Sequence, residues 1–285
     1  MTAARIGIFD SGVGGLSVLR ALQARLPGAA LHYVADSAHA PYGERDDAHI
    51  LARSMRAAVD EVLHDAHRAR EDVCVVQHLV DRGAQAIVVA CNTATAVAVN
   101  PLREAFRALP IVGVEPGLKP ARAASRNGRI GVMATAATLR STRFRALLAA
   151  HVDGVFMHLQ ACHGLAAAIE AGDLDAAPLR ELVERHAAPL RAAGVDTVVL
   201  GCTHYPFVRH WIEAAIGPGV QIVDTAEAIA RRCADVCADL ANFEASRDHA
   251  AIVLETTGDA DHLRSLAARW LPFDIEVAAA PVSLR

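Results

Sequence analysis

Short apolar segments rich in Val and Ile alternate along the chain with Ala-, Leu- and Arg-rich segments whose apolar residues recur at helical spacing. Buried parallel strands and amphipathic helices produce these two patterns. Their alternation predicts an α/β fold in which helices cover mostly parallel sheets. We expect one or two helices with a solvated face over residues 46–80. The expected strands are residues 6–9, 31–35, 86–90, 111–114, 130–133, 154–159, 197–201 and 221–223.

The pattern of the first half is faintly repeated in the second. RGAQAIVVACNT (82–93) aligns without a gap with AAGVDTVVLGCTH (192–204), and this alignment places Cys91 on Cys202. IGIFDSG (6–12) similarly matches IGVMATA (130–136). Chance similarity between buried strands is the alternative interpretation, because few residues are identical. Each cysteine follows its strand by one residue, a position that faces the ligand crevice in open α/β sheets.

Composition restricts the class of protein. With 285 residues, 53% of them hydrophobic, the chain can bury a large core, and we expect two domains. A net charge of -4 without runs of like charge argues against a nucleic-acid partner. No apolar stretch approaches the length of a membrane span, and no export leader precedes the first strand. We therefore expect a cytoplasmic protein without membrane contacts.

The cysteines and lysines narrow the chemistry. Six cysteines are spread over a chain without an export signal, which disfavours disulfides. Cys233 and Cys237 have helical spacing but no further ligand pair nearby, so we interpret them as small core residues and expect no metal. Lys119 is the single lysine and lies in a Pro-flanked connection, where a pyridoxal Schiff base is not expected.

The stretch FDSGVGG, residues 9–15, has two functional interpretations. Gly12-x-Gly14-x-x-Ser17 follows a strand as a phosphate-binding loop does, and Asp36 ends the next strand like a ribose-binding acid. However, the third glycine is missing, and Asp10 would repel the phosphate that a helix N-terminus attracts. A helix cap formed by Asp10 and Ser11 is a purely structural alternative. We favour an anionic acceptor for an ammonium group.

Two thiols at strand ends suggest proton transfer. Either cysteine alone is most simply a small core residue, whereas a pair at a crevice can act as bases or nucleophiles. His204, Asp10 and Glu170 are candidates for tuning them. Thiols on opposite sides of a carbon acid could remove a proton from one face and return one to the other, which inverts a stereocentre. The Pro-Tyr-Gly of PYGERD (41–46) is first a turn signal.

The assembled motifs resemble those of the bacterial glutamate racemases of the aspartate/glutamate racemase superfamily. The resemblance implies two α/β domains related by a pseudo-twofold axis, residues 1–115 with 225–285 and residues 116–224. It also implies glutamate in the cleft between them and no cofactor. The matching segments, in family order, are IGIFDSGVGGLSVL, YVADSAHAPYGERD, AIVVACNTATAV, PIVGVEPGLKPA, IGVMATAATLRS, VVLGCTHYP, IVDTAEAIA and TTGD.

Carried over by position, the resemblance makes Cys91 the base toward D-glutamate and Cys202 the base toward L-glutamate. Asp10 and His204 would assist proton transfer at Cys91 and Cys202, respectively. Asp36 and Glu170 are the other acids that the family places near the site. The implied substrate-binding residues are Asp10, Ser11, Tyr42, Gly43, Asn92, Thr93, Thr203 and His204.

The chain departs from the family pattern in two places. Residues 44–83 form a longer segment than usual, for which we expect an extended helix or an added surface element. In ACHGLAAAIEAG (161–172), His163 replaces the proline expected after the cysteine, which weakens the assignment of Glu170.

The implied activity is the cofactor-independent interconversion of L- and D-glutamate. It would supply D-glutamate for peptidoglycan and so for cell-wall biogenesis and cell shape. The resemblance also suggests a homodimer. An aspartate racemase or another cysteine-pair isomerase is the nearest alternative. A hydrolase with one essential thiol and His204 as base, a nucleotide-binding protein dependent on Gly14, and a binding module without turnover are the alternatives from other classes.

Overall fold

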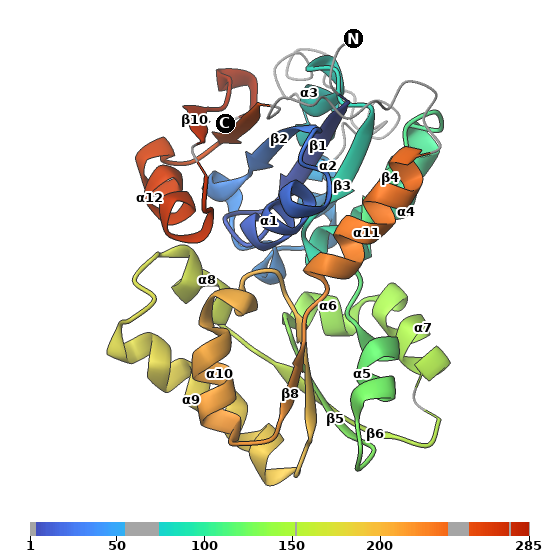
Figure 1. The fold of residues 1–285 in the computed structure, drawn as a ribbon, viewed down its shortest axis with the longest axis vertical. Helices are drawn as coiled ribbons and strands as arrows, with labels where there is room; N and C mark the ends of the chain where they lie inside the picture. The colour runs from blue at the N-terminus through green and yellow to red at the C-terminus, as the bar shows by residue number, and fades with distance from the viewer. Residues whose placement is uncertain (1–3, 55–73, 152, 239–250, 274, 285) are drawn as a thin grey trace.

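The computed structural model describes residues 4–54, 74–151, 153–238, 251–273 and 275–284, and its strands form two parallel sheets, one above the other in Figure 1. The upper sheet has the strand order β10-β9-β2-β1-β3-β4. Every neighbouring pair in it is parallel. Its strands are β1 (Arg5–Asp10), β2 (Ala30–Ala35), β3 (Ala86–Val89), β4 (Ile111–Gly113), β9 (Ile252–Thr256) and β10 (Glu276–Ala279).

The lower sheet has the order β6-β5-β7-β8 and is also entirely parallel. Its strands are β5 (Arg129–Ala134), β6 (Phe156–Ala161), β7 (Thr197–Gly201) and β8 (Gln221–Val223). This order repeats the β2-β1-β3-β4 core of the upper sheet, with β5 equivalent to β1 and β7 equivalent to β3. The sequence repeat that aligned Cys91 with Cys202 therefore corresponds to a repeat of topology.

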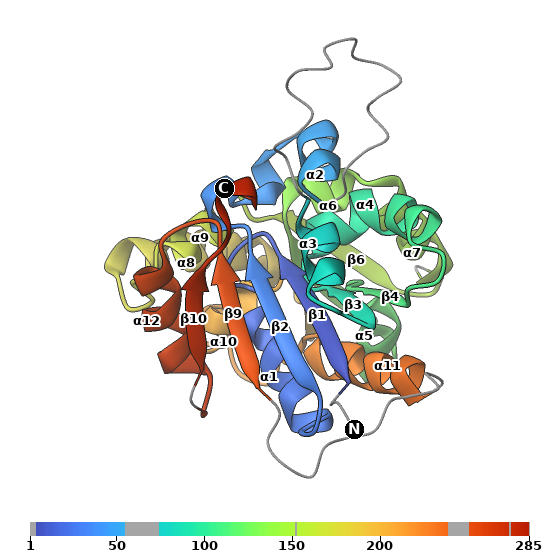
Figure 2. The ribbon, with the colours of Figure 1, turned by 90° about the horizontal axis from the view of Figure 1, so that it is seen from above.

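Helices cover both faces of each sheet, as Figures 1 and 2 show. In the upper sheet α1 packs against α11 and α12, whereas α2 packs against α3 and α4. The helices are α1 (Leu16–Arg25), α2 (Asp47–Ser54), α3 (Val75–Asp81), α4 (Asn92–Ala105), α5 (Leu118–Ala124), α6 (Ala136–Arg140), α7 (Thr142–His151), α8 (Leu165–Glu170), α9 (Ala177–Ala192), α10 (Arg209–Ile216), α11 (Ala226–Ala238) and α12 (Ala260–Trp270).

The apolar runs that predicted strands are apolar because both faces of the sheets are buried. Along β1, Ile6 and Ile8 pack into the core with α1, while Phe9 points to the other face and packs with residues of α3 and α4. In the lower sheet Val198 faces α9, and Val199 faces α5 and α7. A strand buried on both faces reads as a continuous apolar run rather than as an alternating one.

All eight expected strands are present, within two residues of the expected bounds, and the α/β class is confirmed. The expectation was wrong in omitting β9 and β10, which extend the upper sheet beyond β2. The helical region 46–80 contains α2 and all but the last residue of α3. Residues 55–73 of the longer 44–83 segment lie outside the described residues. The domain boundaries at 115/116 and 224/225 stay a prediction.

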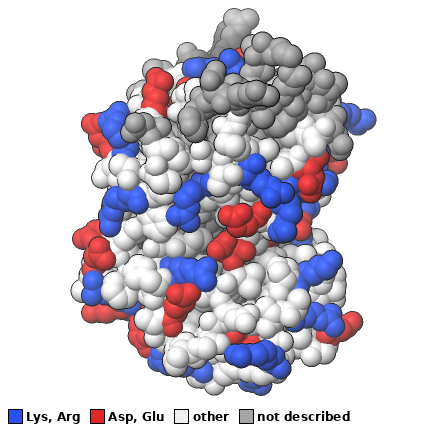
Figure 3. Space-filling model, in the orientation of Figure 1, with Lys and Arg blue, Asp and Glu red and all other residues white. Residues whose placement is uncertain are grey.

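The surface charge is mixed on the face seen in Figure 3. On the face drawn in Figure 3, Lys and Arg side chains are interspersed with Asp and Glu, without a field of one sign. Within the described ranges, none of the helices combines the length and apolar character that crossing a bilayer requires.

Candidate active site

The two thiols lie at equivalent points of the two sheets. In each sheet the strand order changes direction beside the first strand of the repeat, between β1 and β3 above and between β5 and β7 below. Crevices form outside the carboxyl ends of parallel strands at such points. Asp10 ends β1, Cys91 comes shortly after β3, and Cys202 directly follows β7. The fold thus brings Asp10, Cys91 and Cys202 to the ends of the two sheets that face each other.

Cys91 is the N-cap residue of α4. Its Sγ accepts a hydrogen bond from the backbone N–H of Ala94 at 3.4 Å and lies 3.6 Å from the Ser11 hydroxyl oxygen. Only 6% of the residue is exposed. Burial, together with the nearby charge of Asp10, raises the pKa of the thiol to about 12, more than its hydrogen bonds lower it. In this arrangement Cys91 keeps its proton.

Asp10 connects the two halves of the crevice. Its Oδ1 accepts the backbone N–H of Gly12 at 2.8 Å and the hydroxyl of Ser11 at 3.3 Å. Its Oδ2 accepts the hydroxyl of Thr203 at 3.0 Å. Complete burial raises the pKa of the carboxyl to about 6, although His204 and these hydrogen bonds oppose the shift. Asp10 is therefore a carboxylate at neutral pH that can take up a proton nearby.

Cys202 has an imidazole as its neighbour. Its Sγ lies 3.8 Å from Nδ1 of His204, and Nε2 of the same ring lies 2.6 Å from Oε2 of Glu170. Burial by itself would lower the pKa of His204, but the hydrogen bonds and charges of Cys202 and Glu170 raise it well above its usual value. His204 therefore carries a proton beside the Cys202 sulfur.

Glu170 holds the glycine-rich loop against the lower half of the site. Its Oε2 accepts the backbone N–H of Val13 at 2.9 Å, and its Oε1 accepts the hydroxyl of Ser37 at 2.9 Å. Burial raises the pKa of Glu170, but the hydrogen bond with His204 and the other contacts outweigh it, so the pKa falls below its usual value. The proline-to-His163 replacement thus leaves the carboxylate in contact with His204.

Glycines make this close approach possible. A Cβ atom on Gly12 would lie 2.3 Å from Oε2 of Glu170, and one on Gly14 would lie 2.4 Å from Nδ1 of His204. Gly43 approaches the lower half of the molecule equally closely, because a Cβ there would lie 2.6 Å from Cγ2 of Thr135. The glycines therefore serve contact between the two sheets rather than a phosphate.

Asp36 and Tyr42 form a supporting cluster. The Asp36 carboxylate accepts hydrogen bonds from Nε and Nη2 of Arg53 at 2.9 and 2.7 Å. It also accepts the Tyr42 hydroxyl at 2.6 Å and the Thr257 hydroxyl at 2.9 Å. Nδ1 of His39 lies 3.2 Å from its Oδ1. Burial would raise the pKa of Asp36, but these partners bring it well below its usual range. Asp36 is thus a permanent anion that positions Tyr42, and its hydrogen bonds are with this cluster rather than with a thiol.

The start of α4 supplies polar groups beside Cys91. The carboxamide oxygen of Asn92 is buried and finds no hydrogen-bond partner among the described residues, so it can accept a donor from a ligand. The Thr93 hydroxyl lies 2.9 Å from that of Thr135 and 3.2 Å from that of Thr138, which belong to the lower half. The ends of both sheets therefore meet in a layer of hydroxyl groups.

Sequence reasoning missed several of these groups. Ser37, Arg53, Thr135 and Thr138 were not singled out. One signal could have found Thr135: the alignment of 6–12 with 130–136 places it on Ser11.

Across the described ranges, the three-residue cluster suited to metal binding is His32, His78 and Glu255, which lies apart from both thiols. Lys119 is exposed on α5.

The comparisons with known proteins agree with this geometry. The sequence model of the Asp/Glu/Hydantoin racemase family matches residues 16–233. A glutamate racemase of Pseudomonas paraeruginosa is 47% identical over 230 residues, 81% of this chain and 80% of the relative. The crystal structure of glutamate racemase isoform RacE1 from Bacillus anthracis has a TM-score of 0.81 at 30% identity and covers 99% of both chains.

The structure of Escherichia coli glutamate racemase, solved with L-glutamate and the activator UDP-MurNAc-ala, has a TM-score of 0.80 at 29% identity and covers 97% of this chain and 100% of its own. Sequence and structure therefore point the same way: the chain belongs to the Asp/Glu/Hydantoin racemase family and, within it, to the glutamate racemases.

Proposed function

We propose that the protein interconverts L- and D-glutamate by proton transfer between two thiols. The observation that carries the proposal is the placement of Cys91 and Cys202 after equivalent strands of the two sheets, each buried and each beside its own proton-handling partner. Proton transfer by a positioned side chain requires such contact with a group of matched acidity. The glutamate bound in the Escherichia coli relative supplies the substrate class.

In the direction from L-glutamate, the Cys202 thiolate takes the α-proton, and the electron pair of the broken C–H bond stays on the α-carbon. The Cys91 thiol then gives its proton to the opposite face of that carbon and becomes a thiolate. From D-glutamate the roles are exchanged. His204 stabilises the charged form of Cys202, and Asp10 can accept and return the proton of Cys91.

No electron sink is required in this scheme, so the protein itself must stabilise the negative charge that develops toward the substrate carboxylate. Hydroxyl groups of Ser11, Thr93 and Thr203 and backbone N–H groups are suited to this, because they are held in place before the reaction begins. The free carboxamide oxygen of Asn92 and the Asp10 carboxylate are suited to the substrate ammonium. We propose Tyr42 and Gly43 as the remaining substrate-binding residues.

The test is solvent exchange at the α-carbon. The protein is incubated in D₂O with L-glutamate or D-glutamate, and with both aspartates and both alanines as controls. We expect deuterium at the α-carbon of glutamate and formation of the other enantiomer from either start. Exchange with aspartate in preference to glutamate would instead indicate an aspartate racemase. Absence of exchange from all six amino acids would refute the proposal.

The cellular assignment is part of the same proposal. We place the activity in the bacterial cytoplasm, where D-glutamate is needed for peptidoglycan, and we propose a homodimer. Depletion of the protein in its host should cause cell-wall defects that external D-glutamate relieves. The mass of the protein in solution, measured by light scattering, tests the dimer directly.

A further inference from the structure

A second cluster of ionisable side chains lies in the upper sheet, away from the thiols. His32 comes from β2, Glu255 from the neighbouring strand β9, and His78 from α3, which packs on this part of the sheet. Glu255 and His78 are buried, with 4% and 6% exposed. A carboxylate and two imidazoles in such a place need mutual compensation, because burying an unpaired charge is costly.

Both imidazoles point at the same oxygen. Nε2 of His78 lies 2.5 Å from Oε2 of Glu255, and Nε2 of His32 lies 3.3 Å from it. The second contact is not a hydrogen bond, and Nε2 of His32 is a buried atom without a hydrogen-bond partner among the described residues. The three atoms all lie within 4.8 Å of one another. Three potential donor atoms thus converge on one point, and one of them is unsatisfied.

We propose that His32, His78 and Glu255 form a binding site for a transition-metal dication of the zinc type. Neutral imidazole nitrogens and a carboxylate oxygen are ligands that zinc accepts, and two histidines with one glutamate form a known three-ligand set with an open fourth position. A metal ion would replace the hydrogen bond between His78 and Glu255 and would bind all three donor atoms at once. The inference does not depend on the racemase activity.

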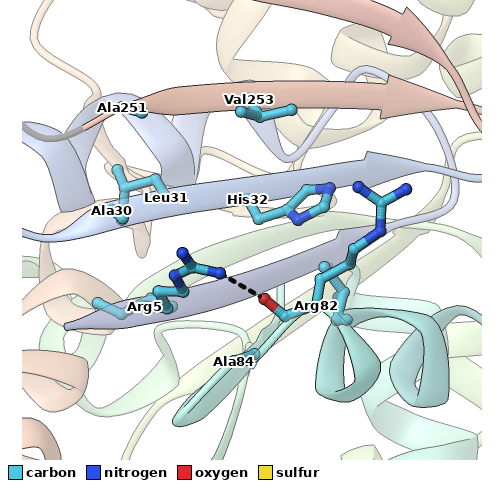
Figure 4. Close-up of a pocket in the computed structure, with 10 residues that line it drawn as sticks. Arg5, Ala30, Leu31, His32, Arg82, Ala84, Ala251 and Val253 are labelled. Carbon is cyan, nitrogen blue, oxygen red and sulfur yellow. Dashed lines mark hydrogen bonds between the residues drawn. The ribbon is translucent and has the colours of Figure 1, made fainter. Parts of the chain in front are cut away.

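The surroundings fit such an ion. A cavity of about 220 Å³ adjoins His32, and Figure 4 shows the His32 ring and the Arg82 side chain at its wall. Nη2 of Arg82 lies 3.3 Å from Oε1 of Glu255, the oxygen that does not face the histidines. Arg82 can therefore orient the carboxylate from outside while Oε2 binds the metal. The cavity offers room for a water molecule or a small anion as fourth ligand.

The arginines also fix the position of the helix that carries His78. Nη1 of Arg5, on β1, donates to the backbone oxygen of Arg82 at 2.9 Å, a bond that Figure 4 draws across the cavity. Arg82 is the C-cap residue of α3, so this bond holds the end of the helix against the sheet. The His78 side chain is thereby kept near Glu255 and His32, so that only a small shift of the donor atoms is needed to admit a metal ion.

Titration of Co²⁺ into the chelator-treated full-length protein tests the proposal, with visible absorption as the readout. We expect one equivalent to bind with the absorption bands of low-coordinate cobalt and without a thiolate-to-cobalt charge-transfer band. His32→Ala and Glu255→Gln should each weaken binding at least about tenfold, since even residues that only orient metal ligands have effects of that size. His210→Ala, at an exposed position on α10, is the matched control and should bind as the wild type does.

Two results would overturn the proposal. A thiolate-to-cobalt band would place the metal at the cysteines, and unchanged affinity in both His32→Ala and Glu255→Gln would show that the cluster does not bind it. Glu255→Gln preserves the volume of a buried side chain. If this variant still fails to fold, His32→Ala, at a partly exposed position, decides the question by itself. Equilibrium dialysis with Zn²⁺ repeats the measurement without a coloured ion.

Discussion

The surroundings of Cys91 and Cys202 differ although their positions in the fold are equivalent. After β3 the chain enters α4 at once, and Cys91 caps it beside Ser11 and Asp10. After β7 the chain first makes a short 3-10 helix, Tyr205–Val208, and His204 at its start faces Cys202. Topology therefore determines where the sulfurs lie, whereas the neighbouring charge comes from the end of β1 for Cys91 and from the residues after β7 for Cys202.

This difference gives the two thiols opposite neighbours, an anion beside Cys91 and an imidazole beside Cys202. Burial and the Asp10 carboxylate raise the pKa of Cys91 to about 12, while the His204 ring, whose pKa is raised well above its usual value, lies 3.8 Å from the Cys202 sulfur. In the proposed scheme, Cys91 is the thiol that gives a proton during the reaction from L-glutamate, and its raised pKa suits that role.

Removal of either thiol should have the largest effect. Cys91→Ala and Cys202→Ala should each lower the racemisation rate by about 10³-fold or more, because the remaining thiol cannot reach both faces of the α-carbon. The rate is measured by circular dichroism from each enantiomer. Cys233→Ala, at a buried cysteine of α11, is the matched control and should keep its activity. Near-wild-type turnover in either active-site variant would break the two-thiol scheme.

Substitution of the partners tests whether the halves differ as described. His204→Asn and Asp10→Asn should each lower kcat/KM by about 10²-fold. The fall must be equal from both enantiomers, because the equilibrium constant between mirror images is one. The kinetic isotope effect of α-deuteration separates the halves. His204→Asn should increase the isotope effect measured with L-glutamate more, and Asp10→Asn should increase the isotope effect measured with D-glutamate more. Identical isotope effects in the two variants would argue against distinct partners.

The contact between the loop of residues 12–15 and the lower half can be loosened by one methyl group. Gly14→Ala places a carbon against the His204 ring and should lower kcat/KM about 10- to 100-fold, since small displacements of reacting groups are costly. Gly7→Ala is the control, because its Cβ would lie 2.7 Å from Cδ1 of Ile87 inside the core. That variant should lose stability but keep kcat/KM per folded molecule. Equal kinetic losses would indicate a general folding defect.

The smallest expected effect concerns stability. The folded pKa of Asp10, about 6, exceeds its ordinary value of 3.8, so folding binds a proton and stability falls as pH rises between these values. Asp10→Asn removes this cost and should stabilise the protein by about 1–2 kcal/mol above pH 6, after allowance for altered hydrogen bonds. The gain should shrink toward pH 4. Urea unfolding at several pH values measures it, and a gain independent of pH would contradict the assignment.

The sequence predicted those parts of the molecule whose local pattern reflects burial. Val- and Ile-rich runs such as 86–90 and 197–201 are buried on both faces and identified eight strands. The last two strands were missed because β9 contains Glu255, and β10 is four residues long with two alanines at an edge of the sheet. Their order depends on pairing with β2 and with each other, which no local pattern records.

The same distinction holds for the site. Asp10, Cys91 and Cys202 could be found because strand ends in an α/β sheet point to a crevice. Arg53 and Thr135 could not be found in this way, because their contacts arise only when α2 meets Asp36 and when the two sheets face each other. Glu170 was named as a candidate for tuning the thiols, but its partner could not be predicted, because its hydrogen bond with His204 depends on how α8 lies against the glycine-rich loop.

The hydrogen bonds between the two sheets also affect the speed of turnover. Asp10 with Thr203, Glu170 with Val13, and Thr93 with Thr135 join the two halves at a site in which both cysteine residues are more than nine-tenths buried. Under the proposed function, we expect these bonds to open when glutamate enters and again when the product leaves. A motion of whole sheets is slowed by solvent friction. Turnover of the wild type should therefore decrease as the viscosity of the medium increases, even though the chemistry involves only protons.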